Sequence, residues 1–139
     1  MSIRPPTSDE IVHSDKASSY TLSILTMREA DARRLMGKTT VTAYRRVHEV
    51  LSSALDEVER GRDPSEAVLA LTKSLILVKY QVAREVVSPQ LASYIEPIIM
   101  NVLSCVKESR DLIKCRDRAR NARLILDALA VLVYQHGRP

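Results

Sequence analysis

Residues 107–135 read KESRDLIKCRDRARNARLILDALAVLVYQ, and this stretch decides the fold. Its apolar side chains recur at alternating steps of three and four residues, which places them on one face of an α-helix. They are Leu112, Cys115, Ala119, Ala122, Leu126, Leu129 and Val133. The spacing predicts a helix over about residues 111–135, which Gly137 ends.

The same stretch holds the net charge of the chain. Of 21 basic and 17 acidic residues, seven and three lie in residues 107–123, which leaves 14 of each elsewhere. Arg116, Arg120 and Arg123 fall along one stripe of the predicted helix, away from its apolar seam. A fixed row of guanidinium groups suits a polyanion with regularly spaced phosphates, although such a charge run is more often a solvated surface.

The composition favours an all-α fold. The chain has no Phe or Trp and only three Gly, so few positions suit the tight turns of an all-β protein. Periodicity and cap signals predict a compact bundle of about five to six helices in a single domain over residues 19–139. Residues 1–18 are polar and contain two prolines, which predicts a disordered or mobile lead-in.

The helix boundaries rest on local signals. Gly37 and Gly61 end helices that begin near residues 20 and 40. Asp63-Pro64 and Ser88-Pro89 are cap-then-proline starts. The helix over about residues 64–87 is apolar around most of its circumference, which predicts a central position in the bundle. Pro97 is expected to break or kink the following helix at Glu96.

Catalytic and metal-binding patterns are missing from the sequence. The three histidines are scattered, and Cys105 and Cys115 have neither metal nor redox spacing. Cys115 lies on the apolar seam, so it is interpreted as a buried structural thiol. We therefore expect a protein that is not an enzyme and binds no metal or cofactor. Because no secretory signal or membrane-length apolar run is visible, we expect a cytoplasmic location without membrane contact.

The apolar helix offers a second polar feature. Lys73, Tyr80 and Arg84 lie within about 20° of one azimuth, at about 100° per residue. Two cations beside a tyrosine ring could hold a phosphate and contact a sugar or base. Equally, Tyr80 could be partly buried and Arg84 could pair with Glu85.

Two motifs carry a resemblance to a known family. Residues 79–85 read KYQVARE, and Asp127-Ala128-Leu129 is followed by Tyr134 and Gly137. In this order, over residues 68–139, the chain resembles the small subunit of type III-A CRISPR interference complexes. It departs from the family pattern in a longer, more basic stretch before the last helix and in aliphatic residues where Phe is frequent. The related small subunits of other CRISPR subtypes are an alternative.

The resemblance implies a noncatalytic, all-α protein whose copies stack along a crRNA-guided ribonucleoprotein used in antiviral defence. Its expected partners are crRNA, target RNA, other effector subunits and copies of itself, with contacts to the backbone of the target RNA and of the guide–target duplex. The resemblance assigns Arg84, Arg120 and Arg123 to RNA, and helical geometry adds Lys73, Lys79, Arg116 and Arg118. The alternative function is a helical interaction module that docks an acidic protein partner through the arginine-rich helix.

Overall fold

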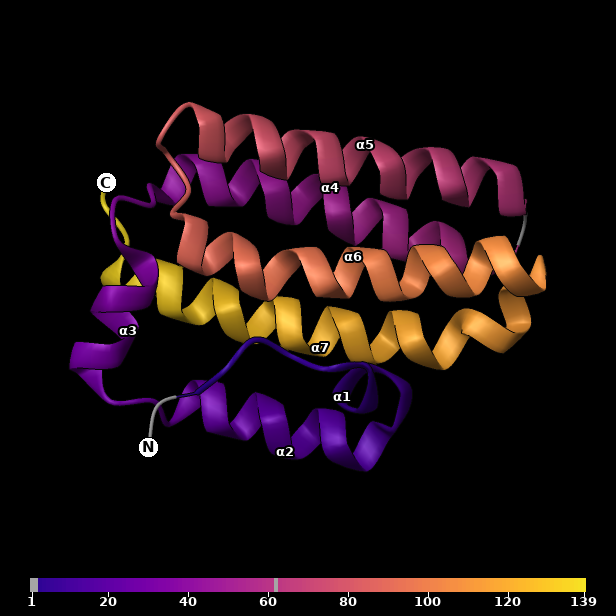
Figure 1. Cartoon of the computed structure of the whole chain (residues 1–139), viewed down its shortest axis with the longest axis horizontal. Coiled ribbons are helices and arrows are strands. Elements are labelled where there is room, and N and C mark those ends of the chain that lie inside the picture. The colour runs from indigo at the N-terminus through magenta and orange to yellow at the C-terminus, as the bar shows by residue number, and fades with distance from the viewer. Residues whose placement is uncertain (1–2, 62) are drawn as a thin grey trace.

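The structure is a computed structural model that describes residues 3–61 and 63–139, and these form seven α-helices (Figure 1). The helices are α1 (Ser8–Val12), α2 (Ser14–Leu25), α3 (Glu29–Met36), α4 (Val41–Arg60), α5 (Pro64–Ala83), α6 (Pro89–Ser109) and α7 (Leu112–His136). The all-α class is confirmed, while the described residues hold more helices than the five to six expected. None of these helices combines the length and apolar character needed to cross a membrane.

The four long helices, α4 to α7, form an antiparallel bundle in which each packs against the next and α7 closes onto α4. In this arrangement α5 and α7 are diagonal to each other. Helices α1, α2 and α3 pack on the outer side of α7 (Figure 1). One continuous hydrophobic core joins them all, so the described residues form a single domain.

The central helix is α7 rather than α5. Eleven residues of α7 are buried, compared with five of α5, although the two helices have 25 and 20 residues. The reason is the number of neighbours: α7 packs against α4, α6 and the three N-terminal helices, whereas α5 packs mainly against α4 and α6. The expectation that residues 64–87 form the centre of the bundle is therefore wrong.

Several predicted helix starts and stops are where the local signals place them, while the helix expected to about residue 87 ends at Ala83. Asp63 caps α5 by accepting a hydrogen bond from the Ser65 N–H, and Ser88 caps α6 by accepting one from Leu91. Gly61 ends α4 in the left-handed region, at φ 63°. Cap chemistry acts within one turn of the chain, so neighbouring helices do not disturb it.

Two predicted boundaries differ in the structure. The expected helix over residues 20–36 is two helices, α2 and α3, separated by residues 26–28, and α2 already begins at Ser14. Conversely, Pro97 lies inside a continuous α6. The fully buried Ile95, Ile98 and Ile99 hold this helix against the core, which outweighs one lost backbone hydrogen bond.

The described part of the expected lead-in, residues 3–18, is helical and packed, which corrects the prediction of disorder. Ile11 and Ala17 are buried in the core, and the Asn121 amide on α7 donates to the Ile11 carbonyl at 2.8 Å. Tyr20 and Tyr94 donate their hydroxyls to the carbonyls of residues 4 and 3. A few buried anchors therefore order a segment whose overall composition is polar.

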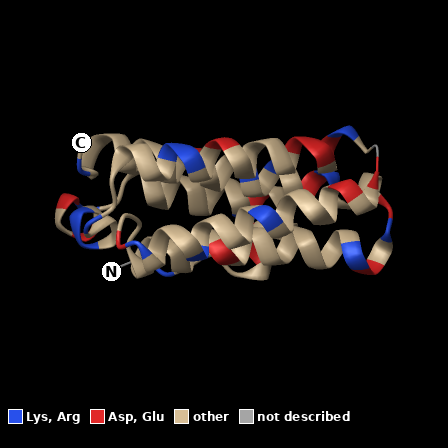
Figure 2. Cartoon of the chain, turned by 90° about the horizontal axis from the view of Figure 1, so that it is seen from above, with Lys and Arg blue, Asp and Glu red and all other residues tan. Residues whose placement is uncertain are grey.

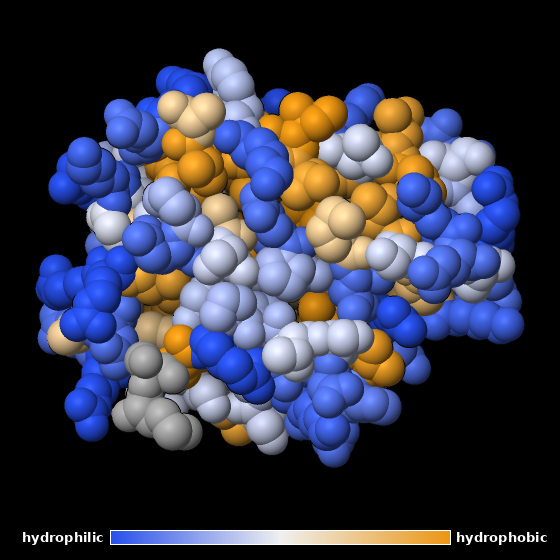
Figure 3. Space-filling model, viewed as in Figure 1, coloured by the Kyte–Doolittle hydropathy of each residue, from blue (hydrophilic) through white to orange (hydrophobic). Residues whose placement is uncertain are grey.

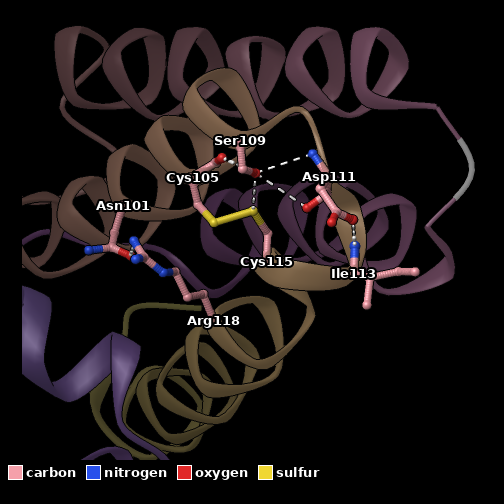
Figure 4. The surroundings of a disulfide bond; sticks show 7 residues. All are labelled: Asn101, Cys105, Ser109, Asp111, Ile113, Cys115 and Arg118. Carbon is pink, nitrogen blue, oxygen red and sulfur yellow. Dashed lines mark hydrogen bonds between the residues drawn. A yellow bond between two sulfur atoms is a disulfide. The ribbon is translucent and has the colours of Figure 1, made fainter.

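The two cysteines form a disulfide bond, which corrects the expectation of a free buried thiol at Cys115. The bond joins Cys105 near the end of α6 to Cys115 in the first turn of α7, with Cα atoms 5.9 Å apart. Figure 4 shows the Ser109 hydroxyl next to it, donating to the Cys105 carbonyl at 2.8 Å. The chain reverses direction at the turn between α6 and α7, within the ten residues that separate the two cysteines. This reversal brings the two sulfur atoms together.

Candidate nucleic-acid interface

The residues predicted to contact RNA fall into two groups that the fold keeps apart. Lys73, Lys79 and Arg84 belong to α5 and the short turn after it, whereas the four arginines at positions 116, 118, 120 and 123 belong to α7. Because α5 and α7 are diagonal in the bundle, with α4 and α6 between them, the two groups cannot form one continuous surface.

On α7, Arg120 and Arg123 turn toward carboxylates of α4. Arg123 forms a salt bridge with Asp56 and lies 3.6 Å from Glu59, and it also donates to the Ser52 carbonyl at 2.9 Å. Arg120 lies 3.5 Å from Glu59 and 3.7 Å from Asp117. Both guanidinium groups are therefore neutralised within the molecule.

These contacts belong to a longer series along α4 and α7, which we call the α4–α7 ladder. Further along, His48 and Asp127 are 2.8 Å apart, and Arg45 donates to the Tyr134 hydroxyl at 3.1 Å. Figure 2 shows acidic and basic residues side by side at the end of the bundle away from the termini. Of the seven basic residues in 107–123, Arg120 and Arg123 are thus paired with the acidic end of α4.

The ladder also explains two residues of the C-terminal motif, Asp127 and Tyr134, in structural terms. A third, Gly137, is required by close packing: a Cβ atom there would stand 2.6 Å from the Val133 carbonyl oxygen. The next residue, Arg138, exchanges backbone hydrogen bonds with Thr39 and Val41. These contacts tie the C-terminus to the α3–α4 connection.

The other two arginines of α7 lie off the ladder. Arg118 donates to the Asn101 side chain of α6 at 3.3 Å (Figure 4). Arg116 is half-buried beside Gly61 and forms no salt bridge with the described residues. Neither side chain projects freely as part of a row.

The opposite side of the bundle carries cations that are not neutralised. Lys73, Arg84 and, on α4, Arg46 are exposed and form no salt bridge with any described residue. Arg46 and Lys73 line one shallow groove between α4 and α5, where the single carboxylate is Glu49. We call Lys73, Arg46 and Arg84 the α4–α5 cation row. Lys79 points away from it and pairs with Glu96 of α6 at 3.0 Å.

An exposed aromatic and apolar stripe runs beside this row. Tyr80 is 57% exposed, and Leu69 and Ile76 on the same side of α5 are 47% and 63% exposed. The Arg84 guanidinium lies 5.6 Å from the centre of the Tyr80 ring, within cation–π range. Tyr80 is thus exposed rather than partly buried, and Arg84 contacts the ring rather than Glu85.

Arg46 is the member of the row that sequence reasoning missed. Nothing in its own neighbourhood distinguishes it from Arg45, which joins the ladder. The length of the connection could have indicated it. Only three residues separate α4 from α5, and helices joined by so short a connection run antiparallel as neighbours. Position 46 is then level with about position 78, five residues from Lys73 and six from Arg84, or about 7–9 Å along the helix in each direction.

Within residues 3–61 and 63–139, no three or more His, Cys, Asp or Glu side chains are grouped so that they could hold a metal ion. One surface hollow lies away from the α4–α5 cation row, between residue 3, Tyr20 and the α2–α3 turn. Its lining contains no pair of side chains arranged as nucleophile and base.

No protein-family model matches the chain, and no curated protein or solved structure shows a significant match to it. The resemblance to a CRISPR small subunit therefore stays a prediction, carried by the motifs of α5 and α7. Exposed cations without a salt bridge among the described residues lie on the α4–α5 side of the bundle, and others, Lys107, Arg110 and Lys114, lie around the α6–α7 turn.

Proposed function

We propose that this protein is a noncatalytic, cytoplasmic subunit of a crRNA-guided type III CRISPR ribonucleoprotein, and that it contacts the RNA backbone through the α4–α5 cation row. The motif resemblance supports the kind of complex. The observation that carries the choice of surface is the row itself, in which three exposed cations have no salt-bridge partner among the described residues.

The row suits a strand whose sequence is read by base pairing with a guide. Lys73, Arg46 and Arg84 offer charge to phosphates without a pocket shaped for a particular base. Tyr80 gives one ring on which an unpaired base can stack, and stacking tolerates any base. We therefore expect weak, salt-sensitive binding with little sequence preference.

The first test measures binding of a fluorescent, single-stranded RNA by the isolated protein as a function of salt. If three phosphates are neutralised, the slope of log Kobs against log salt is about −2, at roughly 0.7 per phosphate for single strands. Lys73→Glu and Arg46→Glu should each weaken binding several-fold, whereas Glu49→Gln should tighten it because it removes the carboxylate from the groove.

The matched control is Lys107→Glu, which makes the same change of charge on an exposed lysine near the C-terminal end of α6. Equal losses for Lys73→Glu and Lys107→Glu would show a nonspecific charge effect and overturn the assignment of the row. If Arg120→Glu weakens RNA binding more than Lys73→Glu, the RNA contacts α7 instead. Failure to bind RNA, together with recovery of an acidic protein from the host, would favour the helical interaction module.

A further inference from the structure

The outward side of α5 combines apolar exposure with a symmetric pattern of charge. Figure 3 shows apolar side chains gathering over α5 and α6 on one face of the molecule. Leu69, Ile76 and Tyr80 form a stripe along α5 that no other described element covers. Contiguous exposed apolar patches typically mark interfaces, whereas single exposed apolar residues are ordinary.

The charges on α5 indicate which partner fits the stripe. Glu66 and Arg84 are both exposed and form no salt bridge with described residues. They are eighteen residues apart, which is five turns at 3.6 residues per turn, so both lie along the same edge of the stripe. Glu66 lies nine residues before Leu75, and Arg84 lies nine residues after it.

We propose that two copies of this chain pair through α5, antiparallel, about a two-fold axis level with Leu75. Residues equally distant from this level then face each other, so Glu66 of each copy meets Arg84 of the other, twice per dimer. Tyr80 of one copy lies one residue's rise from the level of Leu69 in the other. The two Ile76 side chains meet next to the axis, and the stripe is covered by itself.

The pairing also covers part of the α4–α5 cation row, so it regulates the proposed RNA contact; this consequence rests on the proposed function. Arg84 is engaged by Glu66 of the copy, and Lys73 lies beside the axis. A face one helix wide is small beside the roughly 1,200–2,000 Å² buried in stable complexes, so we expect a Kd on the order of micromolar. RNA can therefore displace the second copy.

A pair of charge reversals tests the pairing. Glu66→Arg places Arg opposite Arg84 of the copy, and Arg84→Glu places Glu opposite Glu66, so each variant should be monomeric at concentrations where the unaltered protein dimerises. An equimolar mixture of the two should dimerise again, because both facing pairs then have opposite charges. The measurement is sedimentation equilibrium over a hundredfold concentration range, and we expect at least a tenfold rise in Kd for each variant alone.

Two further variants make the test robust. Ile76→Asp puts two carboxylates beside the axis and should abolish the dimer, while Lys73→Leu should tighten the dimer and weaken RNA binding. A monomeric unaltered protein up to millimolar concentration would overturn the proposal, as would single reversals that dimerise normally. RNA that binds the dimer without dissociating it would overturn the regulatory consequence and leave the pairing itself in place.

The two proposals fail in different ways. Glu66→Arg keeps the whole cation row, so the monomeric variant should bind RNA at least as tightly as the unaltered protein. If it is monomeric and binds no RNA, the pairing stands and the proposed function falls. If it binds RNA normally but the unaltered protein never dimerises, the pairing alone falls.

Discussion

Helices α5 and α7 lie diagonal to each other in one bundle, and their burial is the reverse of what their composition indicates. α5 is the more apolar of the two, yet three of its large apolar side chains face solvent. α7 carries five cations between positions 114 and 123, yet it is the most enclosed helix. The burial of a helix therefore depends on the number of helices that pack against it. A charged helix can be central when some of its charged residues lie along one edge and form salt bridges with a neighbouring helix.

The small residues of α7 help to explain how it accepts so many neighbours. Ala119, Ala122 and Ala128 are buried and let adjacent helices approach closely. The α4–α7 ladder then uses the basic edge of α7 at the boundary of the core. In α5 the buried side is narrower, with five of its 20 residues buried, and Leu69, Ile76 and Tyr80 are exposed. Exposed apolar side chains occur on α7 as well, at Ile113, Leu124, Val131 and Tyr134.

The largest expected effect compares one apolar truncation on each helix. Leu129→Ala removes a fully buried side chain of α7 and should lower the free energy of unfolding by about 2–5 kcal/mol. Ile76→Ala removes an exposed one of α5 and should change it by no more than about 0.5 kcal/mol. Urea unfolding of both variants measures the difference, and equal losses would mean that α5 is as enclosed as α7.

This contrast also separates what the sequence predicts from what it does not. The seam of α7, the cap at Asp63 and the stop at Gly61 depend on residues within one or two turns, so periodicity and cap chemistry locate them. The choice of central helix depends on where residues 3–36 pack, which is set by scattered buried side chains such as Ile11 and Ile24 and by contacts such as the Asn121 amide on the Ile11 carbonyl. The average composition of a segment does not reveal the few residues that anchor it to the core.

For the candidate site, too, one part could be predicted from the sequence and another could not. Helical periodicity places Lys73 and Arg84 on the same exposed side of α5, about 16 Å apart along the helix. It also places Arg120 and Arg123 on one edge of α7, but it cannot reveal that Asp56 and Glu59 lie across from them. Ion pairing between helices is a tertiary property, so a cluster of charge in the sequence is not yet a charged surface.

The disulfide bond is a second difference between α7 and α5. It links α7 covalently to α6, whereas no disulfide bond links the described part of α5 to another helix. Closing a loop of this length should stabilise the fold by roughly 2–3 kcal/mol, mainly through the unfolded chain. Reduction should therefore lower the melting temperature of the protein. A Cys105→Ser, Cys115→Ser double variant is the control and should not respond to reductant.

The state of this bond also bears on the proposed cytoplasmic location. Disulfide bonds are rare in the cytoplasm except in hyperthermophilic organisms. The chain has only two Asn and three Gln beside 21 basic residues, a composition in keeping with such a host. If two free thiols are titrated in the protein purified without reductant, the bond is absent and this prediction is contradicted.

A smaller effect concerns the packing of the N-terminal segment that encloses α7. Arg4 lies 2.6 Å from Glu10, and this hydrogen-bonded pair lowers the pKa of Glu10 from its usual 4.5 to about 2. Because the folded-state pKa is the lower one, the stabilisation is complete above about pH 4.5 and is lost as the pH falls toward 2. After allowance for the exposure of Arg4, it is worth roughly 1–2 kcal/mol.

The measurement is the difference in unfolding free energy between the unaltered protein and Glu10→Gln at pH 7 and at pH 3. The difference should shrink at the lower pH, because the unaltered carboxyl group loses part of its charge in the unfolded chain. The matched control is Glu29→Gln, since Glu29 is paired with Arg33 on the exposed surface of α3. A difference that is independent of pH would show that the Arg4–Glu10 pair adds nothing to the enclosure of α7.

The smallest effect on stability, and the most discriminating for function, compares cations of the two helices. Arg120→Ala removes exposed salt bridges to Glu59 and Asp117 and should destabilise the fold by no more than about 1 kcal/mol. Lys73→Ala removes no salt bridge with a described residue, so its melting temperature should be unchanged. For RNA the order reverses: Lys73→Ala should weaken binding and Arg120→Ala should not. Salt-bridged cations are expected to affect stability, and cations without a salt bridge are expected to affect RNA binding. If both variants changed the melting temperature and the RNA affinity equally, this distinction between α5 and α7 would be contradicted.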